Sequence, residues 1–226
     1  MNVFTRRRSS APAGAVGSPR MKKISESTVR RLSLYLLFLQ EGGDRGIETI
    51  SSDELAQRGG TTSAQVRKDL SFFGSFGKRG LGYSVPELLR QIREILGLSR
   101  TWRVALVGAG KIGSALFSYR DFQRRGFLIR AVFDTDPEKV GASWGDLRVL
   151  PDEEMEAALR GEEIDIVIVA VPAEAAQGVV DRVVHAGVRA ILNFAPIRLR
   201  VPPSVSLRNV DMTVELEGLA YAIHNR

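Results

Sequence analysis

Residues 102–113 read WRVALVGAGKIG, an apolar run that leads directly into a turn rich in glycine. Gly108, Gly110 and Gly113 have the G-x-G-x-x-G spacing of a dinucleotide-binding turn. The short apolar run predicts a strand that is buried on both faces of a sheet. Residues 112–119, IGSALFSY, which begin within this turn, predict a helix. A strand, a glycine turn and a helix in this order predict the start of a doubly wound parallel sheet.

Each glycine of this turn has its own physical task. Gly108 makes the tight turn, Gly110 lets the backbone approach a pyrophosphate, and Gly113 lets the helix pack closely on the strand. The start of the helix supplies free amide donors and the positive end of the helix dipole. The turn therefore predicts a site for the pyrophosphate of a dinucleotide.

An acidic residue stands where such a site needs one. Asp134 ends the next apolar run, LIRAVFD, 21 residues after Gly113. Its carboxylate can accept hydrogen bonds from both hydroxyls of a ribose, but it repels a 2′-phosphate. Thr135 and Asp136 provide no arginine to offset that repulsion. We therefore expect NAD⁺ or NADH as the cofactor and not the 2′-phosphorylated form.

Further strand-like runs, IDIVIVAV and VRAILNF, continue the alternation of strands and helices. Ligands of parallel sheets bind at the carboxyl ends of the strands, so residues that follow these runs are expected to line the same crevice. The predicted cofactor residues of the turn, the acid and the strand ends are Gly108, Ala109, Gly110, Lys111, Ile112, Gly113, Asp134, Thr135, Asp136, Val171, Pro172, Asn193 and Phe194. Residues 99–212 are predicted to form this Rossmann-type domain. Residues 213–226 predict a terminal helix that has no partner element and could be exchanged between subunits.

The first part of the chain predicts a different kind of domain. Helical patterns cover residues 25–40, 51–58, 62–73 and 85–96, and Gly42-Gly43 is expected to end the first. Capping boxes, in which a serine or threonine precedes a glutamate or glutamine by three positions, open the second and third helices at Ser51 and Thr62. A short helix, a glycine turn and a capped helix form a helix-turn-helix. The glycines of residues 74–82 then indicate a β-hairpin, so residues 21–98 are predicted to be a winged helix-turn-helix.

The third helix has the side chains that a major groove accepts. Val66 and Leu70 share the inner face with Phe73, whereas Arg67 and Lys68 lie on the outer face together with small and polar residues. The predicted DNA contacts are Thr62, Ser63, Gln65, Arg67 and Lys68 on the helix and Lys78 and Arg79 in the hairpin. The alternative is an ordinary solvated basic face, but the capped helix and the basic hairpin follow each other directly.

Charge and composition agree with this division. The net charge is +6, of which residues 1–100 hold +8 and residues 101–226 hold −2. A basic first half suggests that only this half meets a polyanion. The 226 residues include no cysteine, which excludes disulfides and thiol catalysis and suits the cytoplasm. We expect no transmembrane segment and no metal site, and residues 1–20 are predicted to be a disordered basic arm.

Catalysis finds little support in the sequence. A dehydrogenase needs a proton donor or acceptor beside the nicotinamide. His185 and His224 are the only histidines, and Tyr119 lacks the lysine of short-chain reductases because Gln123 stands four positions later. We predict no catalytic residue and no enzyme activity. Two alternatives stay open, an NAD-dependent oxidoreductase with an accessory helical domain and a protein that binds coenzyme A or another adenine nucleotide.

Several long blocks of the chain resemble the Rex family of bacterial redox-sensing transcriptional repressors. They are ISSDELAQ (50–57), AQVRKDLSFFGSFGKRGLGY (64–83), the glycine turn and NVDMTVELEGL (209–219). The resemblance covers residue 24 to the C-terminus. It implies a homodimer with winged-helix and Rossmann domains whose last helix is swapped into the partner subunit. It also implies that the dimer binds an inverted-repeat operator in double-stranded DNA when NADH is low and releases it when NADH binds.

The resemblance also assigns roles to single residues. Arg67 and Lys68 match recognition-helix contacts, and Tyr119 and Asp211 match positions near the nicotinamide. The chain departs from the family in two places. Lys111 stands where relatives commonly have asparagine, and a lysine there can strengthen a pyrophosphate contact. Leu37 replaces an arginine that in many relatives pairs with the aspartate matching Asp211 and helps to couple the two domains.

Overall fold

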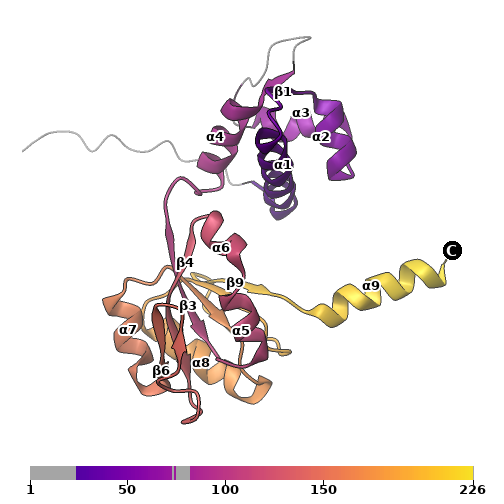
Figure 1. Cartoon of the computed structure of the whole chain (residues 1–226). Helices are drawn as coiled ribbons and strands as arrows, with labels where there is room; N and C mark the ends of the chain where they lie inside the picture. Colours follow the sequence, from indigo (N-terminus) through magenta and orange to yellow (C-terminus); the bar gives the residue numbers. More distant parts are fainter. Residues whose placement is uncertain (1–23, 73, 75–81, 226) are drawn as a thin grey trace, which may run out of the picture. The chain divides into compact units, whose positions relative to one another are not determined.

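The computed structural model describes residues 24–72, 74 and 82–225 and separates into two compact units between Leu96 and Gly97 (Figure 1). The sequence predicts this boundary after residue 98. The predicted arm of residues 1–20 and the predicted DNA contacts Lys78 and Arg79 lie outside the described residues.

The first unit is mostly helical. Its elements are α1 (Glu26–Asp44), β1 (Thr49–Ile50), α2 (Ser52–Gly59), α3 (Ser63–Ser71), β2 (Tyr83–Ser84) and α4 (Val85–Ile95). The strands β1 and β2 pair antiparallel, so the end of the predicted hairpin is tied to the segment before α2. The core consists of buried side chains from all four helices, among them Leu36, Leu55, Leu70 and Ile92.

The ends of these helices follow local chemistry. The predicted capping box at Ser51 is confirmed, because its Oγ accepts from the Glu54 N–H and the Glu54 carboxylate accepts from the Ser51 N–H. The hydrogen bonds that the Glu54 carboxylate accepts from Ser51, first that from the backbone N–H and then that from Oγ, hold the pKa of Glu54 below its usual value. The prediction that Gly42-Gly43 ends the first helix is wrong. α1 continues to Asp44, and the chain turns at Gly46, whose φ is +77°.

The second unit contains a seven-stranded sheet in the order β5-β6-β4-β3-β7-β8-β9. Its strands are β3 (Trp102–Val107), β4 (Phe127–Asp134), β5 (Ser143–Trp144), β6 (Leu147–Pro151), β7 (Ile166–Val169), β8 (Ala190–Asn193) and β9 (Ser206–Asn209). All neighbouring strands are parallel except β5 and β6. The predicted parallel sheet is confirmed, and the strands missing from the prediction, β5, β6 and β9, lie at its two edges.

Helices cover both faces of the sheet. They are α5 (Lys111–Phe117), α6 (Arg120–Arg124), η1 (Asp152–Glu154), α7 (Met155–Gly161) and α8 (Ala173–His185), whereas the last helix, α9 (Met212–His224), lies off the sheet. On one face Val107 and Val169 pack with residues of α7 and α8, and on the other Leu106 and Val132 pack with residues of α5 and α6. Both faces of the central strands are therefore buried, which explains their continuous apolar sequence.

The terminal helix α9 differs from the others, since every one of its residues is exposed. Figure 1 shows it extending away from the sheet of its unit. Its large apolar side chains include Leu216, Leu219 and Ile223, which are 61–74% exposed. Among the described residues, no helix has the length and apolarity needed to cross a membrane, and no cluster of acidic, histidine or cysteine residues could hold a metal ion.

Candidate nucleotide pocket and nucleic-acid interface

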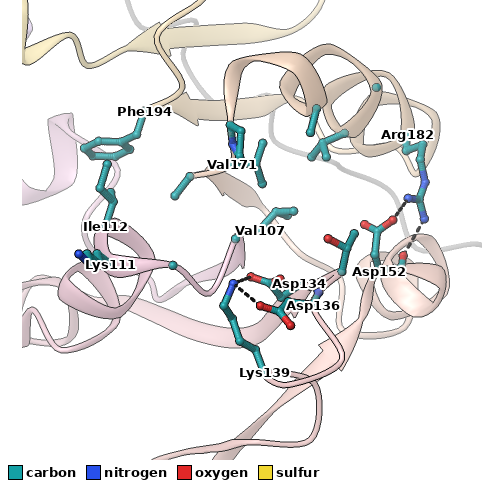
Figure 2. Close-up of a pocket in the computed structure, with 18 of the residues that line it drawn as sticks. Val107, Lys111, Ile112, Asp134, Asp136, Lys139, Asp152, Val171, Arg182 and Phe194 are labelled. Carbon is teal, nitrogen blue, oxygen red and sulfur yellow. Dashed lines mark hydrogen bonds and ion pairs between the residues drawn. The ribbon is translucent and has the colours of Figure 1, made fainter.

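A cavity of about 940 Å³ lies at the carboxyl ends of the central strands (Figure 2). It is lined by most of the predicted cofactor residues: Gly108, Gly110, Lys111, Ile112, Asp134, Thr135, Asp136, Val171, Pro172 and Phe194. A cavity of this size suits a dinucleotide. The strand order also places it beside β3, between β4 and β7, where such ligands bind in doubly wound sheets.

The glycine turn is shaped by close approaches of the backbone. Gly108 has a φ of +104°, and a Cβ there would lie 2.3 Å from the carbonyl oxygen of Ala170. A Cβ at Gly113 would lie 1.9 Å from the carbonyl oxygen of Gly108, so the helix can pack this closely only without a side chain. A Cβ at Gly110, in contrast, would meet no described atom within 4 Å. The space at Gly110 is therefore open for a ligand.

Asp134 ties the turn to the end of β4. Its Oδ2 accepts from the Ala109 N–H at 2.7 Å and its Oδ1 accepts from the Asp136 N–H at 2.8 Å. These bonds fix the carboxylate in the pocket, and its remaining lone pairs can still accept from a ribose. Ala109 and Gly113 do not line the cavity, and they contribute by shaping the turn.

Lys139 is a pocket residue that the sequence analysis missed. Its Nζ lies 3.5 Å from the Asp134 carboxylate and 3.1 Å from the Asp136 carboxylate, and the residue lines the cavity. The Asp136 carboxylate is the main cause that raises the pKa of Lys139. The pKa of Asp136 is lowered, first by the Glu138 N–H and then by Lys139. Its spacing of three residues from Asp136 was the signal available in the sequence.

A second missed group lies at the far end of the cavity (Figure 2). Arg182 of α8 donates from Nη1 to the Asp152 carboxylate, from Nη2 to the Asp152 carbonyl at 2.7 Å and from Nε to Glu156 at 3.1 Å. Burial lowers the pKa of Arg182, but the two carboxylates outweigh it and raise the pKa above its usual value. The partners come from three different elements, so no local pattern could have revealed the group.

The prediction of Asn193 as a cofactor residue is not supported by its position. Its side chain is fully buried, and its amide group donates to Ala195, Ile197 and Asn209 while its Oδ1 accepts from the Ala195 N–H. The amide thus holds the chain after β8 against β9. Asn193 does end β8 as predicted, but its side chain turns into the protein and not into the crevice.

Tyr119 and Asp211 also lie outside the nucleotide cavity in the single chain. Tyr119 lines a separate cavity of about 500 Å³ beside β7 and β8, where its ring lies edge-on to Phe122. Asp211 caps α9, with its Oδ1 accepting from the Thr213 N–H at 2.9 Å. Their predicted places near the nicotinamide stay predictions.

The predicted recognition helix α3 has the expected inner and outer faces. Val66 and Leu70 are buried, whereas Arg67 and Lys68 are exposed. Arg67 donates from Nη1 to the Oγ of Ser52 at 3.0 Å, which ties its side chain to the start of α2. Thr62 and Ser63 lie at the start of α3, where the helix has free N–H groups that suit a phosphate.

Gln65 does not complete the predicted second capping box. The Thr62 Oγ1 accepts from the Gln65 N–H at 3.2 Å, but the Gln65 amide turns away and donates to Asp69 at 2.8 Å. Its predicted contact with a base is therefore in competition with a bond inside the protein. Gln65 is better assigned to the support of α3 than to its DNA-facing surface.

Asp69 is a completely buried acid, which the sequence analysis overlooked. Arg31 and Tyr35, both on α1, donate to its carboxylate together with Gln65. Burial raises the pKa of Asp69, but its hydrogen bonds, above all those from Arg31, outweigh this and lower it. Burial, followed by the charge of Asp69, raises the pKa of Tyr35 to about 12. The group fixes α3 on α1.

Comparisons with known proteins cover both units of the chain. Residues 99–197 match the family model "CoA binding domain", and residues 23–71 match "Putative DNA-binding protein N-terminus". The redox-sensing transcriptional repressor Rex of Carboxydothermus hydrogenoformans is 51% identical over 89% of this chain and 97% of its own length. The protein of the same name from Desulfitobacterium hafniense is 48% identical over 90% and 97%.

Two solved structures of a related repressor, RSP, are similar over nearly the whole chain. The complex with beta-NAD+ and operator DNA has a TM-score of 0.85 and 38% identity, and it covers 90% of this chain and 94% of that one. The complex with beta-NADH has a TM-score of 0.82 and 37% identity, with 89% and 95% covered. With relatives this similar over both units, the chain belongs to the Rex family of redox-sensing transcriptional repressors.

Proposed function

We propose that this protein represses transcription by binding DNA through α3 and releases the DNA when NADH occupies the cavity beside Asp134. The observation that carries the proposal is the joint presence of a glycine turn with a fixed carboxylate in one unit and a capped helix with exposed Arg67 and Lys68 in the other. RSP, similar over both units, has been solved with nucleotide and operator DNA.

The cavity favours a nicotinamide dinucleotide without a 2′-phosphate. Asp134 and Asp136 present carboxylates where the adenosine ribose would lie, and Lys139, already paired with both, only partly offsets their charge. At the opposite end, Figure 2 shows Ile112 and Phe194 beside each other. An apolar end accepts the neutral dihydronicotinamide at a lower desolvation cost than the charged oxidised ring. This gives a physical reason for a response to NADH.

The response requires a difference in affinity between two states of the protein. NADH must bind the state that cannot bind DNA better than the other, since equal affinity for both would shift nothing. A hundredfold difference, about 2.7 kcal/mol, is sufficient if the two states start near balance.

We infer that the protein acts as a homodimer on an inverted-repeat operator. The support is α9, whose apolar side chains are exposed in the single chain and would be buried by a second copy. A two-fold symmetric dimer matches an operator of two inverted half-sites. The cytoplasm, where NADH and DNA meet in bacteria, is the proposed location.

We also propose that the protein has no catalytic activity. Tyr119, the tyrosine considered as a proton carrier, lines the second cavity and not the nucleotide cavity. The match to a coenzyme A binding model makes the coenzyme the second candidate ligand. NADH is preferred because the similar RSP structure holds beta-NADH.

The test is the binding of a labelled inverted-repeat duplex from the promoters of the same organism, at a stated salt concentration. NADH, NAD⁺, ADP and coenzyme A are titrated separately into the complex. We expect NADH to release the DNA at concentrations at which the other three do not. Release by ADP or coenzyme A at the same concentrations would contradict redox sensing, and a duplex that never binds would contradict the repressor function.

A further inference from the structure

The G-x-G-x-x-G turn and the acid at Asp134 do not explain the cluster of Arg182, Asp152 and Glu156. Figure 2 shows Asp134 lying between the Arg182–Asp152 pair and the end of the cavity marked by Ile112 and Phe194. In dinucleotide sites of this fold the pyrophosphate lies on the glycine turn and the acid at the end of the second strand holds the adenosine ribose. The adenine must then lie beyond Asp134, toward Arg182. This step rests on the proposed function, in which the cavity binds NADH.

We propose that Arg182 binds the adenine ring of the nucleotide by offering the flat face of its guanidinium group as a stacking surface. Asp152 and Glu156 are positioning residues that hold the group in place. Arg182 lines the cavity from α8, and its side chain is 33% exposed. Most of the side chain is therefore held by the protein, while the exposed part can contact a ligand in the cavity.

The hydrogen bonds of Arg182 fix its plane. Nη1 and Nη2 donate to the carboxylate and carbonyl of Asp152, and Nε donates to Glu156. Guanidinium N–H groups donate in the plane of the group, so these three bonds occupy its edges and not its faces. A group that is already immobilised loses little conformational entropy when a ring stacks on it.

The charges at this end favour a neutral ring over a phosphate. Carboxylates are in excess here, because two cations, Lys139 and Arg182, form ion pairs with four acids: Asp134, Asp136, Asp152 and Glu156. An added phosphate would meet this excess of negative charge. A guanidinium group paired to carboxylates still stacks well on an aromatic face. The Asp152 carboxylate can also accept from the exocyclic amine of adenine.

The alternative is that Arg182 only joins α8 to η1 and α7. Such a role changes the stability of the fold but does not distinguish the two halves of the ligand. The experiment therefore compares ligands that carry the adenine with one that lacks it.

The full-length chain and its Arg182→Met variant are titrated with NADH, ADP and reduced nicotinamide mononucleotide, which has no adenine. We expect Arg182→Met to weaken the binding of NADH and ADP roughly tenfold and to leave the mononucleotide unchanged. Unchanged affinity for NADH and ADP would overturn the proposal. An equal loss for all three ligands would overturn it as well, since it would indicate general damage to the cavity.

Two further variants make the test independent of folding. Arg182→Lys keeps the positive charge beside Asp152 but lacks the planar face, so we expect most of the loss to persist; wild-type affinity in this variant would overturn stacking. Arg160→Met removes another partner of Glu156, 3.4 Å away, that does not line the cavity. It should bind all three ligands normally. If the unaltered chain fails to bind NADH, the proposed function fails, whereas normal binding with an unaffected Arg182→Met removes this inference alone.

Discussion

Arg31 of α1 holds the buried carboxylate of Asp69 on α3 with two hydrogen bonds, of 2.6 Å from Nε and 2.7 Å from Nη2. The two residues are 38 positions apart in the sequence. A bidentate pair of this kind fixes both distance and angle between two helices. The Arg31–Asp69 pair, on the buried face of α3, therefore fixes the orientation of the helix that exposes Arg67 and Lys68.

Asp69→Asn should loosen this attachment. The variant keeps one acceptor but leaves Arg31 without its charge partner, so we expect the first unit to lose about 1.5–3 kcal/mol of stability. DNA binding should weaken while NADH binding persists, because the nucleotide cavity belongs to the other unit. Urea unfolding and duplex binding measure the two effects. Asp53→Asn, which changes an exposed acid on α2, is the control and should alter neither by much.

The same pair predicts a sensitivity to acid. The folded pKa of Asp69 is lower than its ordinary value of 3.8. The pair therefore contributes stability at every pH above about 4, and this contribution is lost as the pH falls through the folded pKa. Urea unfolding of the unaltered chain between pH 7 and pH 3 should show the loss, and Asp69→Asn should show a smaller one. Equal slopes in the two proteins would mean that other carboxylates dominate.

Lys68→Ala should weaken operator binding by removing a contact from the exposed face of α3. If Lys68 meets a phosphate, the slope of log affinity against log salt should fall by about 1. Fluorescence anisotropy at four salt concentrations gives both numbers. Arg90→Ala removes an exposed cation from α4 and serves as the control. Wild-type affinity and slope in Lys68→Ala would remove α3 as the recognition helix.

Substitution by alanine should have a different effect at each of two glycines of the turn, on stability at Gly113 and on NADH binding at Gly110. Gly113→Ala places a Cβ 1.9 Å from a carbonyl oxygen and should lower the melting temperature of the second unit. Gly110→Ala adds a methyl group in open space and should leave the melting temperature nearly unchanged, because alanine costs little at that position. It should nevertheless weaken NADH binding at least tenfold by blocking the pyrophosphate. Thermal unfolding and NADH titration of both variants separate the two effects; a Gly110→Ala protein with normal NADH affinity would contradict the predicted position of the pyrophosphate.

The features predicted correctly from the sequence are those that a local pattern of residues determines. The continuous apolar runs identified the central strands, and Ser51 with Glu54 identified a helix start. Groups that bring distant segments together were not predicted. Neither the burial of Asp69 nor the pairing of Arg182 produces a periodic pattern in the sequence. Asn193 shows a third limit: the end of a strand can be located from sequence, but the direction of one polar side chain depends on β9, which the sequence did not reveal.

The closeness of Gly113 to the carbonyl oxygen of Gly108 has a consequence for how this protein can evolve. Every base change in a glycine codon that alters the amino acid introduces a side chain with a Cβ. No single mutational step at Gly113 can therefore produce a slightly different turn, since even alanine collides with the backbone. Selection for another ligand would have to act on the walls of the cavity, at residues such as Lys139 and Arg182, while the turn itself stays unchanged.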